Sequence, residues 1–103
     1  MPSLLFSEPW EAVSDDASVF EAEVRREVTR GHPLFGIVCR ALARRIDRDD
    51  IAVACLDGSD RFAVVHHTWS GEPETDPSCP HTTFYPNEAA LQRQVDLDHA
   101  EYV

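Results

Sequence analysis

Apolar residues are densest in the middle of the chain, where two apolar runs flank a short polar stretch within residues 51–70. The stretch between them is Asp57-Gly58-Ser59-Asp60. Asp-Gly between segments rich in Val, Ile and Phe predicts a β-hairpin, because glycine readily adopts the positive φ that a tight turn requires. We therefore predict two paired strands here and expect the rest of the chain to be organised around them.

The predicted hairpin is apolar on both faces, which is typical of a strand pair at the centre of a sheet. With the turn near Gly58, alternation places one set of residues on one face: Ile51, Val53, Cys55, Phe62, Val64, His66 and Thr68. The other face then carries Ala52, Ala54, Leu56, Ala63, Val65, His67 and Trp69. The neighbours His66 and His67 point in opposite directions, so they cannot bind one metal ion together unless the strand is bulged.

The segment 34–46, LFGIVCRALARRI, fits two periodicities. As a helix it would align Val38, Leu42 and Ile46. As a strand it would alternate Ile37, Cys39, Ala41 and Ala43 with Val38, Arg40, Leu42 and Arg44. Period alone does not resolve so short a run. We predict a strand over 37–46, because residues 47–50 are typical of a hairpin connection and a third strand stabilises the central pair.

A helix is predicted before these strands. Ser18-Val19-Phe20-Glu21 fits a capping box, and apolar residues then recur every four positions to about Arg30. Gly31-His32-Pro33 is typical of a helix stop, because glycine supplies the left-handed cap and proline prevents continuation.

A second helix is predicted near the end of the chain. Asn87 is expected to cap it, and it is expected to run to about Val95 with Ala90, Leu91 and Val95 facing inward.

These elements predict one domain, residues 1–103, of the α+β class. The expected architecture is a three-stranded antiparallel meander flanked by an N-terminal and a C-terminal helix, in the order α-β-β-β-α, with both helices on one face. Residues 1–17 are expected to form an irregular arm and residues 70–83 a long loop, and Phe84-Tyr85 are candidates for a short edge strand. The predicted core is Phe20, Val24, Val28, Leu42, Val53, Val65 and Leu91.

The net charge of −10 is unevenly distributed. Residues 1–23 carry six acids and no base, residues 24–48 carry seven Arg against two acids, and residues 49–103 carry eleven acids against two Arg. This balance disfavours nucleic acid and anionic membranes as partners, since phosphate contacts need a cationic surface. It is compatible with a basic protein partner.

Localisation follows from what the sequence lacks. The chain has no apolar run of about 20 residues and no basic, apolar signal segment at its start, so a cytoplasmic protein is expected. Its three cysteines, Cys39, Cys55 and Cys79, argue against a disulfide framework, and Cys39 and Cys55 are expected to be inert core residues within apolar strands.

Two sequence signatures support a resemblance. They are Gly31-His32-Pro33-Leu34-Phe35-Gly36 (H-P-L-F-G) and the VVHHTWSG of residues 64–71 (V-V-H-x-T-W-S-G), followed by PHTTF at residues 80–84. With these signatures the chain resembles a group of small uncharacterised bacterial proteins, over about residues 18–103. The resemblance implies one compact unit and transfers no activity and no functional residue.

Side chains of the kind that bind metals are concentrated in a few positions: His32, His66 or His67, Cys79 and His81. Thiolate and imidazole together suit zinc, so one hypothesis is a zinc site formed by His32, His66, Cys79 and His81. The alternative is that the sheet histidines are hydrogen-bonded and that Cys79 is an incidental loop thiol. The spacing matches no standard zinc finger or ribbon.

Enzymatic chemistry is not indicated. A thiolate–imidazole couple at Cys79 would also need an oxyanion donor and a pocket. Paired carboxylates fall in turns or at a helix start, and four glycines form no phosphate-binding loop.

The remaining interpretation is binding. We expect a protein-interaction module, immunity-like or adaptor-like, with a small metal- or ligand-binding domain as the alternative. Loops that leave a central strand carry function more often than the scaffold does. Contacts with a ligand or partner are therefore expected at His66, Thr68, Trp69 and His81.

Overall fold

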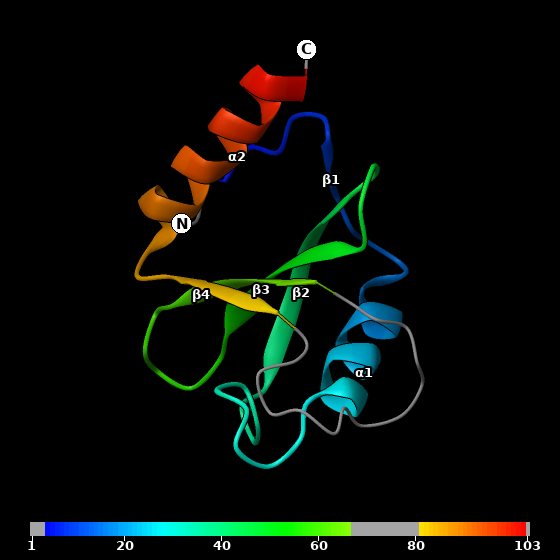
Figure 1. Cartoon of the computed structure of the whole chain (residues 1–103), viewed down its shortest axis with the longest axis vertical. Helices are drawn as coiled ribbons and strands as arrows, with labels where there is room; N and C mark the ends of the chain where they lie inside the picture. Colours follow the sequence, from blue (N-terminus) through cyan, green and yellow to red (C-terminus); the bar gives the residue numbers. More distant parts are fainter. Residues whose placement is uncertain (1–3, 67–80, 103) are drawn as a thin grey trace.

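The computed structural model describes residues 4–66 and 81–102, which form an antiparallel sheet with a helix on each face (Figure 1). In chain order the elements are β1 (Trp10–Ala12), α1 (Ala17–Glu27), β2 (Cys39–Arg45), β3 (Asp50–Cys55), β4 (Phe62–His66), β5 (Thr82–Tyr85) and α2 (Glu88–Tyr102). The strands lie in the order β1-β2-β3-β4-β5. The α+β class is confirmed, and the ambiguous segment 37–46 does contain a strand.

The prediction of three strands was too low, because the sheet has five. The two extra strands are the short edge strands β1 and β5. The backbone of β1 finds partners in Ala43 to Arg45 of β2, and β5 pairs with β4 through Phe84 and Tyr85 among others. Each edge strand is short and lies where the sequence predicted an arm or only a candidate strand.

The central hairpin is present, but its predicted register was wrong by one residue. Ile51 pairs with Val65 and Val53 with Ala63, whereas the sequence analysis placed Val64 and His66 on the face of Ile51. Pairing of odd with even positions requires a turn centred between two residues, as in a tight two-residue turn, whereas the connection here is a wider loop centred on one residue. Asp57 accepts hydrogen bonds from the Ser59 N–H at 3.1 Å and from the Ser59 hydroxyl at 2.5 Å. This loop centres the hairpin on Gly58, whose φ is +84°, so odd-numbered residues of the two strands share a face.

The register divides the apolar residues between two cores, one on each face of the sheet. The core between α1 and the sheet consists of Phe20, Val24, Val28, Leu34, Ala41, Ile51, Val53, Cys55, Ala63 and Val65. The core between α2 and the sheet consists of Trp10, Ala43, Ala52, Leu91 and Val95, with Leu42 half-buried beside them. The prediction that both helices cover one face was therefore wrong. Ala52 and Val64 project away from α1 and need their own cover, which Leu91 and Val95 of α2 provide.

Helix α1 begins at Ala17, one residue before the predicted cap. Its N-cap residue Asp16 makes no side-chain capping bond, so the predicted Ser18–Glu21 capping box is wrong. Glu21 instead accepts a hydrogen bond from the Ala41 N–H of β2 at 2.8 Å. The helix ends at Glu27 because Val28 is extended, with a ψ of 140°.

Helix α2 begins as predicted and extends further. The Ala90 N–H donates to Asn87 Oδ1 at 2.9 Å, which confirms Asn87 as the cap, and the helix continues to Tyr102 rather than ending near Val95. The N-terminal arm runs alongside this helix: the Leu5 N–H donates to Gln92 Oε1 at 2.8 Å, and the Trp10 indole N–H donates to Asp98 Oδ2 at 2.8 Å. The Trp10 bond joins β1 to α2.

In the described part of the chain, neither helix has the length and apolar character needed to cross a membrane.

Candidate functional site

The predicted histidine site is divided by the sheet. His32 is buried on the α1 side, where its Nδ1 accepts a hydrogen bond from the Leu34 N–H at 3.0 Å and its Nε2 lies 3.4 Å from Thr82 Oγ1. His66 lies on the α2 side, and its Nδ1 is 2.6 Å from Asp50 Oδ1. His32 therefore fixes the turn before β2, and His66 links β3 to β4.

His81 is exposed beside His66. The His66 N–H donates to the His81 carbonyl at 2.9 Å, so the backbones of these two predicted contact residues are neighbours. Thr68, Trp69 and Cys79, the remaining predicted site residues, lie outside the described residues. Across residues 4–66 and 81–102, no three His, Cys, Asp or Glu side chains are grouped as metal ligands.

A polar cleft of about 180 Å³ lies between the sheet and α2, and its charged groups largely bind one another. Asp98 accepts the Trp10 bond and lies 3.6 Å from Arg45, which also makes two bonds to Asp47 at 2.9 and 3.0 Å. Burial, followed by the charges of Asp98 and Asp50, raises the pKa of Tyr85. These bonds connect β1, β2 and α2 to one another, which is a structural role.

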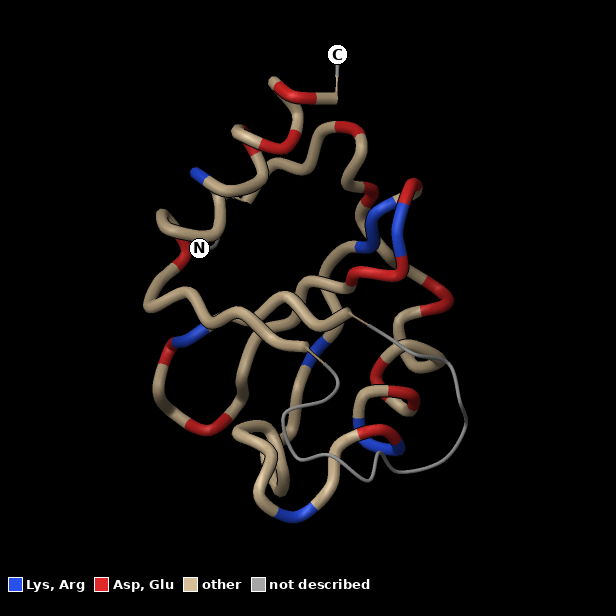
Figure 2. The backbone as a smooth tube through the Cα atoms, in the orientation of Figure 1, with Lys and Arg blue, Asp and Glu red and all other residues tan. Residues whose placement is uncertain are grey.

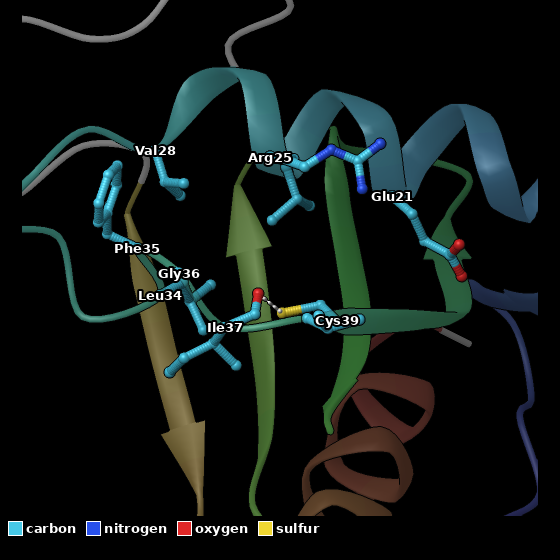
Figure 3. Close-up of a pocket in the computed structure, with 10 residues that line it drawn as sticks. Glu21, Arg25, Val28, Leu34, Phe35, Gly36, Ile37 and Cys39 are labelled. Carbon is cyan, nitrogen blue, oxygen red and sulfur yellow. Dashed lines mark hydrogen bonds between the residues drawn. The ribbon is translucent and has the colours of Figure 1, made fainter. Parts of the chain in front are cut away.

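An apolar pocket of about 320 Å³ opens on the other face of the molecule. It lies between α1 and the segment 34–39 that leads into β2 (Figure 3). Its apolar wall is formed by Val24, Val28, Leu34, Ile37 and Cys39, with the rest of the lining from Glu21, Arg25, Phe35, Gly36 and Val38. A space of this volume accommodates a large apolar side chain or a small ligand.

Local backbone geometry shapes this pocket. The Phe35 N–H donates to the His32 carbonyl at 3.0 Å and the Ile37 N–H to the Leu34 carbonyl at 3.0 Å, so residues 32–37 form two successive turns. Gly36, with a φ of +79°, occupies a conformation that side chains rarely adopt. These turns bury Leu34 and leave the neighbouring Phe35 half exposed.

Exposed apolar side chains continue the pocket onto the surface. Phe35 is 50% exposed, Val38 is 65% exposed and Leu56 is 56% exposed. Phe35 and Val38 line the pocket, whereas Leu56 neighbours Val38 only through a backbone hydrogen bond, from the Leu56 N–H to the Val38 carbonyl at 2.8 Å. Apolar residues gathered around a pocket in this way are typical of interaction surfaces.

The exposed charge around the pocket is positive, opposite to that of the whole chain. Arg25 lines the pocket and is exposed on α1, and Arg30 is exposed on the turn after it. The acids of α1 are engaged or buried: Glu23 and Glu27 are buried, and Glu21, which lines the pocket, accepts a hydrogen bond from the Ala41 N–H. Figure 2 shows basic and acidic positions side by side on α1 and a basic position on the turn after it, whereas α2 is mainly acidic.

The comparisons with known proteins add no assignment. No family model matches the chain, and neither the curated proteins nor the solved structures contain a significant match.

Sequence reasoning missed this pocket because its parts come from different elements. Val24 and Val28 were identified as a buried stripe. The predicted helix stop at Gly31-His32-Pro33 was wrong, because α1 already ends at Glu27 with an extended Val28. The sequence contains no signal for the exposure of Phe35 and Val38, which have the same character as buried residues. Only the path of residues 32–37 beneath α1 determines which apolar side chains remain accessible.

Proposed function

We propose that this protein is a protein-interaction module that binds an acidic peptide segment, with one apolar side chain of the segment inserted in the pocket between α1 and residues 34–39. The observation that carries the proposal is an open apolar pocket of about 320 Å³ within an arginine-bearing surface. Anchoring of one apolar or aromatic side chain in a preformed pocket is a common basis of recognition.

The sign of the partner's charge follows from the side chains at the pocket. Arg25 lines it and Arg30 follows Val28 closely in the chain, and both are exposed. The net charge of −10 predicts a basic partner for the chain as a whole, but the local charge attracts carboxylates. Acidic residues flanking the apolar anchor would therefore increase the association rate and fix the orientation of the segment.

The backbone beside the pocket supports an extended segment. β1 pairs with β2 at Ala43, Arg44 and Arg45, and the Val13 N–H after it donates to the Leu42 carbonyl at 3.0 Å, whereas Cys39 and Ala41 precede that covered part. The Ala41 N–H is bound by the Glu21 carboxylate and not by another strand. A peptide lying along residues 39–41 would replace Glu21 at this N–H and would continue the line of β1.

The test uses three peptides of one length and one apolar pattern, with a central Phe or Leu flanked by Glu, by Lys or by Gln. Binding is measured by calorimetry and by methyl chemical shifts of Val24, Val28, Leu34 and Ile37. We expect the Glu peptide to bind, to shift these methyl signals and to weaken with added salt, since screening reduces charge attraction.

Matched variants separate the site from the rest of the surface. Arg25→Glu with Arg30→Glu should weaken binding by about tenfold or more, whereas Arg93→Glu on α2 should not. Phe35→Ala should weaken binding, and Leu97→Ala, which removes an equally exposed side chain from α2, should leave it unchanged. Equal binding of the Lys peptide, or no binding of any peptide, would overturn the proposal.

A further inference from the structure

Cys39 on β2 and Cys55 on β3 are directly opposite each other in the sheet. The hydrogen bond from the Leu56 N–H to the Val38 carbonyl, at 2.8 Å, lies one residue beyond this pair on each strand. Such a bond is typical of a non-hydrogen-bonded pair, in which opposing Cα atoms are about 4.5 Å apart and side chains approach closely. We propose that Cys39 and Cys55 are a modification site that forms a reversible disulfide across the two strands.

The geometry suits that bond. Disulfides join cysteines whose Cα atoms are about 4.4–6.8 Å apart and whose side chains point toward each other. Both side chains belong to the α1 face of the sheet, where Cys55 is buried in the core and Cys39 packs against it. The two thiols are free. Closure of the bond therefore requires no change in strand register.

The pocket gives one of the two thiols access to solution. Cys39 lines the pocket and is partly exposed, whereas Cys55 is only 5% exposed. A soluble disulfide such as oxidised glutathione therefore reaches Cys39 first. Glutathione is anionic, and Arg25 lies at the same pocket.

The reaction proceeds in two exchange steps. The Cys39 thiolate attacks one sulfur of oxidised glutathione, forms a mixed disulfide and releases one glutathione thiolate. The Cys55 thiolate then attacks the Cys39 sulfur and releases the second. The two protein thiols lose two electrons and two protons, and one oxidised glutathione becomes two reduced glutathione molecules. Excess reduced glutathione or dithiothreitol reverses both steps.

Burial sets the rate of this chemistry. Loss of hydration, with a smaller contribution from Cys55, raises the pKa of Cys39 to about 12, and burial also raises the pKa of Cys55. Because the thiolate is the attacking form, exchange is slow at neutral pH. Its rate should rise about tenfold for each unit of pH below that pKa. The pair therefore responds to sustained oxidation and is not a rapid catalyst.

Oxidation should also act on the proposed peptide site, a consequence that rests on the proposed function. In the reduced protein the Cys39 thiol donates to the Ile37 carbonyl at 3.7 Å, and both residues line the pocket (Figure 3). The disulfide removes this contact and draws the sulfur toward β3. The affinity for the Glu peptide should then change, and bound peptide should slow the reaction of Cys39.

The test uses the full chain carrying Cys79→Ser, so that only Cys39 and Cys55 can react. The protein is incubated with oxidised glutathione at pH 7, 8 and 9, and thiols are counted by alkylation and intact mass. We expect both thiols to be lost from a monomer with no retained glutathione, recovery of both with dithiothreitol, and a rate that rises about tenfold per pH unit. Thermal unfolding of the oxidised form should shift upward, because a cross-link restricts the unfolded chain.

Two further variants of the protein identify the order of the two exchange steps. With Cys55→Ala and Cys79→Ser the reaction should stop at one glutathione adduct, and with Cys39→Ser and Cys79→Ser the remaining buried thiol should stay unreacted. A covalent dimer, two retained adducts, or unchanged thiols at pH 9 would overturn the disulfide. Thiol counting does not depend on peptide binding, so failure of the disulfide and failure of the proposed function give different results.

Discussion

The carboxylate of Glu21 accepts a hydrogen bond at 2.8 Å from the backbone N–H of Ala41, and so joins α1 to the part of β2 that β1 does not cover. An edge strand that presents free N–H groups invites pairing with another chain. Here a side chain from the helix occupies that position. The same contact fixes α1 beside the pocket, because Glu21 and Arg25 are one helical turn apart.

Replacement of Glu21 tests this contact. Glu21→Ala should lower the free energy of unfolding by about 1–2 kcal/mol, because a charge-assisted hydrogen bond is lost and the Ala41 N–H is left without its acceptor. Urea unfolding at pH 7 measures the change. Glu101→Ala, at the exposed end of α2, is the control and should stay within about 0.5 kcal/mol. Similar losses in the two variants would contradict the role assigned to Glu21.

The bond between Trp10 and Asp98 should be a second point of stability. Asp98→Ala removes the acceptor of the buried indole N–H and a partner of Arg45, so we expect a loss of about 2–3 kcal/mol. The control is Asp96→Ala on the same helix, where the side chain is exposed and the expected loss is under about 1 kcal/mol. Urea unfolding followed by far-UV circular dichroism gives both values.

The core beneath α1 should be sensitive to cavities. Val65 is completely buried in the middle of β4, and Val65→Ala should cost about 1–3 kcal/mol. Val19→Ala deletes the same atoms from a side chain of α1 that is 56% exposed, and it should cost almost nothing. Thermal unfolding of the two variants distinguishes the effect of lost core packing from the effect of replacing any valine with alanine. A loss at Val19 as large as that at Val65 would contradict the assigned packing.

Stability at low pH should depend on Asp47. Hydrogen bonds from Arg45 lower the pKa of Asp47 below its usual 3.8 in the folded protein. A lowered folded pKa means that the stabilising contribution is present above pH 3.8 and is lost as the pH falls through the folded value. We therefore expect Asp47→Asn to lower the unfolding temperature at pH 6 and to have little effect near pH 2.

The control for this pH dependence is Asp60→Asn, which alters an exposed carboxylate outside that ion pair. Its unfolding temperature should follow the wild-type pH profile. A constant difference between Asp47→Asn and wild type from pH 6 to pH 2 would contradict the assigned linkage.

Local sequence was sufficient to predict several elements. Asn87 caps α2, the valine stripe of α1 is buried, and the Asp57-Gly58 stretch separates β3 from β4. Each of these features depends on residues close together in the chain, because capping, helical periodicity and turn formation are local interactions.

Tertiary structure decided the rest. Glu21 fits a capping box by sequence, yet its carboxylate binds an N–H twenty residues away, because the edge of β2 lacks a neighbouring strand there. The register of the hairpin depended on how the Ser59 side chain and backbone bind Asp57. A shift of one residue in the register exchanges the two faces of a strand. The register therefore also determined that α1 and α2 cover opposite faces of the sheet and that His32 and His66 lie on different faces.

The same reason applies to the candidate sites. Cys39 and Cys55 can be recognised from the sequence as apolar strand residues, but only the pairing of β2 with β3 brings the two thiols together. The pocket likewise requires α1, the turns of residues 32–37 and the start of β2 to meet. The sequence by itself determined both helices approximately, the central hairpin and its turn, since those preferences are local, but not the short strand β1 or the helix ends. Which residues lie on the same face of the sheet, and which apolar side chains stay exposed, depends on contacts between segments that are distant in the sequence. Only the tertiary structure decided these features.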